Sequence, residues 1–373
     1  MTDDPFARLP KELLVDIYEL VRLKKRRHYL GLVSLAFLPI ARDLFFRNVH
    51  CWRHKHVVRF NYLQTAESDA LRSTRRVKVT FEKGREALPQ LVFTHVPRLT
   101  AITLCGKLKR VTEAFTDFLD SSPSLHLPNL NELVVKVNAP VRPAAGTVNA
   151  TRLLVLERYT RLTELRMDLR VFSREPWSAD ETLSLRSLET LEITSRDNGT
   201  TFVGPLIAAA ASELVNLYIT NPDELSPAAS LDILRALKAP QNLLLLSFSF
   251  GEMLLFEFPP SSLSALTGLE TIEFARGSWS SSLLHSLCRL SRLTELYVDA
   301  VSGMSTAELR ALVLPDSDSV HIPHLSLVVL EEKEGSDWEL GDFDFTDLVD
   351  IVKSVDGFGL KVSGNLAEDA RAF

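Results

Sequence analysis

Apolar residues recur along the chain in a short pattern, L-x-x-L-x-L, in which Ile, Val, Met or Phe can replace Leu. The pattern starts 24 to 32 residues after the previous copy, and its copies begin at Leu99, Leu130, Leu162, Leu188, Leu214, Leu243, Leu269, Leu293 and Leu325. Alternating apolar positions are typical of a half-buried strand, because neighbouring side chains of a strand point to opposite faces. Each copy therefore predicts one short strand, and residues 77–81 predict an earlier one without the leading leucine.

The segments between these strands have the three- and four-residue spacing of amphipathic helices. Cap-like starts at Ser226-Pro227 and at 305–308 predict helices there. Shorter helices are expected at 111–119 and 283–290, and a last one from Thr346 or Asp347. A strand and a helix repeated at this interval must stack on their neighbours to bury their apolar faces. We expect an α/β chain whose parallel strands form a concave sheet.

Residues 77–330 resemble the leucine-rich repeats, which implies a solenoid of about nine to ten irregular repeats. The match is irregular because the usual Asn or Cys after the strand is replaced, for example by Lys107, Arg170 and Pro222. A doubly wound α/β domain is the alternative. It is disfavoured because no glycine-rich phosphate loop follows the first strand.

The first fifty residues have a different pattern. Apolar residues from Leu9 to Val21 form a helical stripe introduced by Pro10, and two further apolar clusters lie at 30–37 and 40–45. The strings at 9–17, 32–37 and 44–49 resemble the F-box. This resemblance implies docking onto a Skp-type adaptor of a Skp-cullin-F-box ubiquitin ligase, through Leu9, Pro10, Leu13, Leu14, Ile17, Val33 and Phe37. Alternatively, these helices only cap the end of the array.

Charge is distributed unevenly along the chain. Residues 1–60 hold 12 Lys and Arg against 6 Asp and Glu, whereas residues 331–373 hold 4 against 12. We expect three domains: an F-box-like helical domain at 1–60, the repeat solenoid at 61–335, and an acidic C-terminal capping segment at 336–373. The net charge of -6 and the lack of a long basic stripe argue against general nucleic-acid binding.

Candidate chemistry is sparse. His50, His54 and His56 lie close to Cys51, but they lack the paired ligand spacing of a zinc site. No nucleophile, metalloprotease or phosphate-loop motif occurs. We therefore expect no enzyme, no cofactor and no metal.

Location is indicated by the cysteines and by the hydropathy of the chain. Three separated cysteines suit reduced thiols, and neither an apolar leader nor a run of about 18 apolar residues is present. We expect an intracellular protein, cytoplasmic or nuclear or both, that is neither secreted nor inserted in a membrane.

The remaining candidate site is the concave face, where residues between the inward leucines are exposed together. Tyrosines among charged residues are typical of protein recognition. The predicted substrate-binding residues are Arg166, Asp168, Glu192, Tyr218, Glu273, Tyr297 and Asp299. The main hypothesis is a non-enzymatic substrate-recognition subunit of a Skp-cullin-F-box ligase that binds an unknown protein substrate. The alternatives are a leucine-rich-repeat binding scaffold outside any ligase and a GTPase-activating repeat protein.

Overall fold

The computed structural model describes residues 6, 9–22, 37–66, 71–81, 93, 95–121, 127–138, 148–173, 183–195, 202–221, 232–233, 235–237, 240–250, 263, 265–278, 281–302, 306–313, 322, 324–331, 345–355, 361–363 and 365–372. The chain divides into two compact units, Met1–Pro140 and Val141–Phe373. Each unit is described by itself below.

The first unit combines helices with four parallel strands. Its elements are α1 (Lys11–Arg22), α3 (Phe37–Arg47), β1 (Asn48–Cys51), α4 (His54–Ala66), β2 (Arg76–Phe81), β3 (Ala101–Gly106), α5 (Leu108–Ser121) and β4 (Glu132–Val137). The strands pair in chain order, β1-β2-β3-β4.

The second unit follows the same plan with eight further strands. Its elements are η5 (Ala150–Arg158), β5 (Glu164–Asp168), η6 (Leu169–Val171), β6 (Thr190–Thr194), α6 (Val203–Ala210), β7 (Asn216–Asn221), β8 (Leu245–Phe250), β9 (Thr271–Ser278), α8 (Ser281–Leu287), β10 (Glu295–Ser302), α9 (Thr306–Val313), β11 (Leu327–Glu331), α10 (Phe345–Val355), β12 (Lys361–Ser363) and α11 (Asn365–Ala372).

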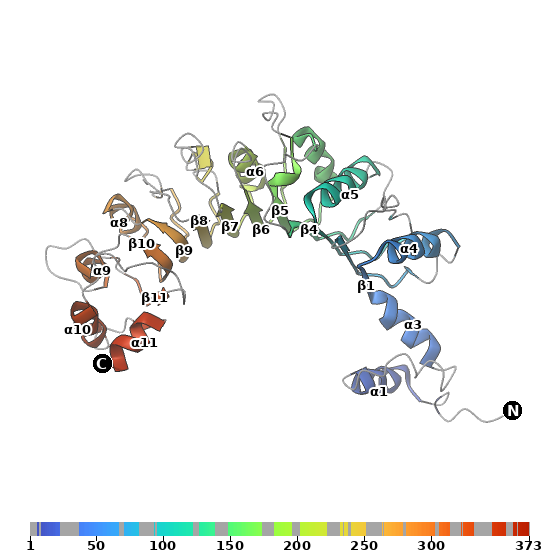
Figure 1. Ribbon diagram of the computed structural model, residues 1–373, viewed down its shortest axis with the longest axis horizontal. Helices are drawn as coiled ribbons and strands as arrows, with labels where there is room; N and C mark the ends of the chain where they lie inside the picture. Colours follow the sequence, from blue (N-terminus) through green and yellow to red (C-terminus); the bar gives the residue numbers. More distant parts are fainter. Residues whose placement is uncertain are drawn as a thin grey trace. The chain divides into compact units, whose positions relative to one another are not determined.

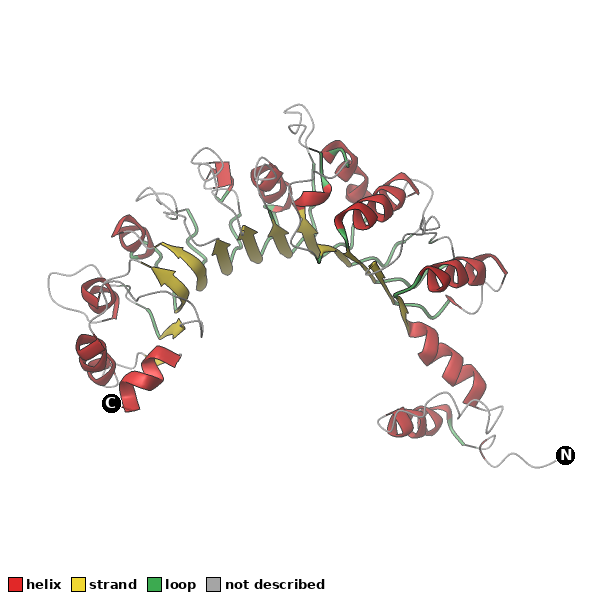
Figure 2. Cartoon of the chain, in the orientation of Figure 1, coloured by secondary structure: helices red, strands yellow, loops and turns green. Residues whose placement is uncertain are grey.

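In the second unit, helices α6, α8 and α9 lie along the same side of the strands (Figures 1 and 2). The strands pair in parallel, and each strand lies beside the strands that precede and follow it along the chain. The inward residues of each strand are buried, as Leu191 and Ile193 of β6 and Leu217 and Ile219 of β7 show. This inward layer faces the helices and forms the core.

All nine predicted copies of the pattern form strands, β3 to β11, and the predicted strand at 77–81 is β2. The expectation of parallel strands is confirmed within each unit. Two strands were not predicted, β1 and β12. Both are short, and only Cys51 of β1 and Val362 of β12 are buried. Such strands lack the repeated apolar alternation on which the sequence pattern depends.

Polar side chains link successive turns of the second unit just before the strands begin. Ser187 Oγ donates to the carbonyl of Thr160, and Ser212 Oγ donates to that of Arg186. Asn242 donates in the same way before Leu243, whereas Thr294 and Ser326 donate from the position after the first leucine of their repeats. These bonds supply a polar ladder from one repeat to the next, although the asparagine position after the strand is not kept. Each bond gives a solvent-exposed backbone carbonyl a side-chain partner from the next repeat.

The predicted helices are found at 108–121, 281–287, 306–313 and 345–355. The helix expected from Ser226 lies partly outside the described residues, but Ile233 and Leu237 of that segment are buried. Three α-helices were not among the predicted ranges: α4, α6 and α11. Helix α4 follows β1 and buries Val57 and Phe60, which stand in a segment rich in Arg, Lys and His. The cluster at 30–37 lies outside the described residues except for Phe37.

Candidate functional site

Helices α6, α8 and α9 leave one face of the second unit's sheet uncovered. Rows of side chains run from strand to strand across this face. Because the strands are in register, equivalent residues lie side by side at the spacing of neighbouring strands. The middle row on β5 to β10 consists of Arg166, Glu192, Tyr218, Ser247, Glu273 and Tyr297. The row before it consists of Glu164, Thr190, Asn216, Leu245, Thr271 and Glu295. We call these two rows the sheet face.

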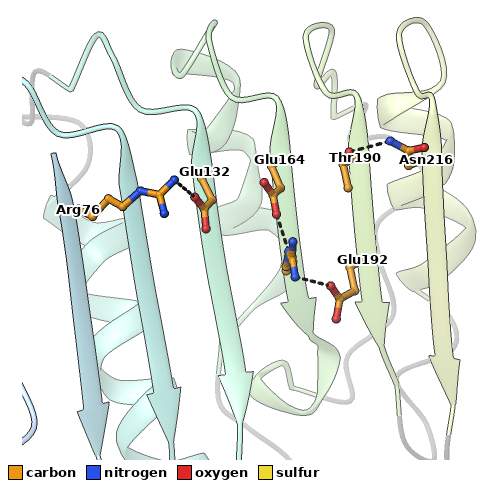
Figure 3. Close-up of polar contacts among 7 residues, drawn as sticks. Arg76, Glu132, Glu164, Thr190, Glu192 and Asn216 are labelled. Carbon is orange, nitrogen blue, oxygen red and sulfur yellow. Dashed lines mark hydrogen bonds and ion pairs between the residues drawn. The ribbon is translucent and has the colours of Figure 1, made fainter. Parts of the chain in front are cut away.

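The β5 end of the sheet face is held by one arginine between two glutamates (Figure 3). Arg166 Nε lies 2.5 Å from Glu164 Oε1, and Arg166 Nη1 lies 3.2 Å from Glu192 Oε2. The Arg166 side chain remains 49% exposed. Exposed ion pairs add little to stability. The pairs therefore mainly fix the direction of a guanidinium that stays open to solvent.

Next to this group, Asn216 Nδ2 donates to Thr190 Oγ1 over 3.3 Å, from β7 to β6 (Figure 3). Tyr218 follows in the middle row beside Glu192. Tyr218 is half-buried. The ring thus presents part of its surface between charged and polar neighbours.

The β10 end of the sheet face is acidic. Tyr297 Oη donates to Glu295 Oε2, and Thr271 Oγ1 donates to the same oxygen, each over 3.3 Å. Glu273 lies opposite Tyr297 in the ladder. The pKa of Tyr297 is raised, first by burial and then by the negative charge and hydrogen bond of Glu295 and the charge of Glu273. The phenol therefore stays protonated and can act as a donor at neutral pH.

Five of the seven predicted substrate-binding residues lie together in the middle row: Arg166, Glu192, Tyr218, Glu273 and Tyr297. Asp299 is on β10 in the following row, and its side chain is outside the described part of the chain. Their role in binding stays a prediction. The predicted substrate-binding residues included none from β8, although the strand register places Leu245 and Ser247 of β8 in these two rows.

Asp168 is the exception, and its predicted exposure is wrong. The side chain is 2% exposed. Its Oδ1 accepts from the backbone N–H of Arg170 at 3.1 Å and from Arg170 Nε at 2.8 Å, which caps the short helix η6. A carboxylate that stabilises a turn in this way is withdrawn from the sheet face.

The first unit has a separate polar arrangement on its strands. Arg76 Nη2 lies 3.6 Å from Glu132 Oε2 across β3, where the small Ala101 occupies the same row (Figure 3). His50 Nε2 lies 2.9 Å from Thr80 Oγ1, which lies 3.3 Å from Cys105 Sγ. The buried Cys105 lacks the solvent exposure that a reactive thiol requires.

The predicted adaptor-binding residues surround a small apolar cluster between α1 and α3. Leu14 and Phe37 are buried in it with Ile40, and Leu9 and Ile17 pack against it. The remaining predicted residues behave differently: Pro10 is exposed, Leu13 is 49% exposed, and Val33 lies outside the described residues. Leu14 and Phe37 thus support the cluster from within, while Leu13 presents an apolar side chain to solvent.

Within the described residues, no three His, Cys, Asp or Glu side chains are grouped so that they could hold a metal ion. None of the described helices has both the length and the apolar character needed to cross a membrane. The geometry offers recognition surfaces.

The parallel ladder, the inward leucines and the repeat interval decide the fold. Both units carry the leucine-rich-repeat fold. No protein-family model matches the chain, and no curated protein sequence matches it. The parallel strand pairing and the inward leucines of this chain itself carry the fold.

Three solved structures are similar to this chain at low identity. Human 5T4, a trophoblast glycoprotein also called Wnt-activated inhibitory factor 1, is 17% identical with a TM-score of 0.39, over 61% of this chain and 76% of that chain. A chain of the mouse RP105/MD-1 complex is 16% identical with a TM-score of 0.39, over 70% and 42%. A leucine-rich-repeat protein of Leptospira interrogans is 12% identical with a TM-score of 0.26, over 79% of each chain.

Proposed function

We propose that this chain is a non-enzymatic leucine-rich-repeat scaffold that binds a protein partner on the sheet face of its second unit. The observation that carries the proposal is the middle row, where Arg166, Tyr218 and Tyr297 lie in register among glutamates. Tyr and Arg are enriched among the residues that dominate protein interfaces. Rigid strands hold these side chains in fixed positions, which lowers the entropy lost on binding.

The test is cross-linked affinity purification with the full-length chain as bait. Tyr218→Asp combined with Tyr297→Asp should remove the specific partner, because two buried contacts would be replaced by desolvated charges. The matched control is Ala265→Asp with Thr267→Asp, two exposed turn positions away from the strands. Retention of every captured protein by the double tyrosine variant, with the same circular dichroism as wild type, would show that the sheet face is not the binding surface.

A finer version of the proposal assigns the chain to a Skp-cullin-F-box ligase, with α1 as the docking element and the sheet face as the substrate site. It is supported by the F-box-like strings and by the exposure of Leu13 beside the buried Leu14. An exposed apolar side chain on a helix is a common anchor for a partner.

Co-purification with a Skp-type adaptor tests this version directly. Leu13→Asp with Ile17→Asp should abolish association, whereas Lys11→Asp with Asp16→Lys, at exposed positions of the same helix, should preserve it. Association that is absent in wild type, or unchanged by the first variant, contradicts the ligase assignment and leaves the scaffold proposal intact.

We further propose an intracellular location, cytoplasmic or nuclear. The support is chemical: the three cysteines are widely separated in the sequence and odd in number, so they suit no disulfide framework, and reduced thiols persist inside cells. Fractionation of cells that express the tagged full-length chain tests this location.

A further inference from the structure

Helix α4 of the first unit has an exposed stripe on the side away from its buried residues. Lys55, Val58, Arg59 and Tyr62 are all exposed and recur at the three- and four-residue spacing of one helix face. Val58 is 45% exposed and Tyr62 is 64% exposed. Val58 lies between the cations Lys55 and Arg59 along the stripe, and the Tyr62 ring follows Arg59, so the stripe combines charge with apolar and aromatic area.

Trp52 extends the stripe at the start of the helix. Its side chain is 56% exposed. Its ring lies 5.6 Å from the His56 ring, centroid to centroid, and Arg53 Cζ lies 5.3 Å from the Trp52 centroid. These contacts hold the indole in place, and an exposed indole held in this way is a preorganised anchor.

The surroundings of this stripe are strongly cationic. Residues 44–66 contain three Arg, one Lys and three His but no Asp or Glu. The pKa of His56 is lowered, first by burial and then by the charges of Lys55, Arg53, His50 and Arg59. These charges make the local potential positive, which disfavours protonation of His56. A bound anion would reduce this positive potential.

We propose that Trp52, Lys55, His56, Val58, Arg59 and Tyr62 form a docking surface, the α4 surface, for an acidic and partly apolar segment of a partner protein. Carboxylates of the partner pair with Lys55 and Arg59, while its apolar side chains cover Val58, Tyr62 and Trp52. The two kinds of contact alternate along the helix, which matches a polypeptide that carries both kinds of side chain. The proposal is independent of the sheet face.

A nucleic acid is the competing occupant, because phosphates also pair with Lys and Arg and bases stack on aromatic rings. Two observations favour the polypeptide. Arg53 and His56 already lie against the Trp52 ring, which reduces the ring area open to a base. Val58, in the middle of the stripe, offers apolar area that a phosphate backbone does not use.

The test measures fluorescence anisotropy of a labelled synthetic peptide, the triplet Glu-Glu-Leu repeated four times, with the full-length protein. We expect saturable binding that weakens by about tenfold, or 1.4 kcal/mol, in Lys55→Glu with Arg59→Glu. Val58→Ser should weaken it less, because it removes only apolar contact. Arg289→Glu with Arg292→Glu is the matched control, since both side chains are exposed in the second unit and the charge change is the same.

Two further probes separate the occupants. A Gln-Gln-Leu peptide of equal length should bind at least about tenfold more weakly, and so should an oligothymidylate. The pKa of His56, followed by NMR, should rise when the Glu-Glu-Leu peptide binds. The proposal is overturned by absence of saturable peptide binding, by equal losses in the control variant, or by oligothymidylate binding that is as tight as peptide binding and indifferent to Val58→Ser.

Discussion

Asp168 occupies an outward register position at the end of β5, yet its side chain is buried. It accepts hydrogen bonds from the backbone and side chain of Arg170, whose own side chain is only 12% exposed. Removing one member of a buried ion pair leaves the other charge desolvated, which costs about 3–5 kcal/mol. The pair therefore fixes the turn into η6 and contributes to the fold of the second unit.

Asp168→Ala should lower the free energy of unfolding by about 3–5 kcal/mol, because the Arg170 guanidinium loses its carboxylate and η6 loses its cap. Urea unfolding followed by circular dichroism measures the loss. Glu192→Ala is the control, since it removes a half-buried partner of the half-exposed Arg166, a surface ion pair that should cost only about 0–1 kcal/mol. Equal midpoints for the two variants would mean that Asp168 is not a structural residue.

Gly106 is a second residue whose role is set by the backbone. Its φ is 140°, and a Cβ built there would lie 2.5 Å from the carbonyl oxygen of Phe81 on the neighbouring strand. Gly106→Ala should therefore cost at least about 1–3 kcal/mol in thermal or urea unfolding. Gly268→Ala is the control, because a Cβ there meets backbone oxygens only at 3.5 Å, in ordinary contact. Comparable stability of the two variants would contradict the predicted strain.

At the scale of elements, a charged side chain on one strand shifts the pKa of a side chain on the same strand or on its neighbour. Burial is the largest cause of the raised Tyr297 pKa and is unaffected by a change at Glu295, so Glu295→Gln should lower the pKa only part of the way toward 10.0. Glu273→Gln, from β9, should lower it less. NMR titration of labelled tyrosine, assigned with Tyr297→Phe, measures both shifts. A pKa that does not change in Glu295→Gln would refute the coupling.

The sign of the matching pH dependence follows from linkage. The folded chain holds the Tyr297 proton more tightly than the unfolded chain does, because its pKa is raised in the folded state. The contribution to stability is present below the unfolded value near 10 and is lost as pH rises through the folded pKa.

The sequence predicted well those elements whose pattern of apolar residues repeats several times along the chain. Strands β3 to β11 follow from paired inward residues such as Leu191 and Ile193, because burial of one face imposes the period. Helix α4 was missed because Val57 and Phe60 stand among basic residues, and the nearby histidines were considered only as metal ligands whose spacing did not fit. Local pattern also could not show that Asp168 is buried, since a capping contact depends on the turn that follows the strand.

At the scale of the whole second unit, each repeat contacts chiefly its neighbours along the chain. Helix α10 contacts α9, α11 and β12, and α6 contacts β6. Stability of such an array is close to a sum of repeat and nearest-neighbour terms, so damage at one place should stay local.

Ile351→Ala in α10 and Ile207→Ala in α6 test this locality with the same chemical change, because both side chains are fully buried. Each truncation should cost about 2–5 kcal/mol. Hydrogen exchange measured by mass spectrometry should show faster exchange around β11 and β12 for Ile351→Ala, and around β6 and its neighbours for Ile207→Ala. If both variants instead accelerate exchange evenly over β5 to β12, the second unit unfolds as one cooperative block. A partner bound on the sheet face would then stabilise every strand of the unit, rather than only the strands that it contacts.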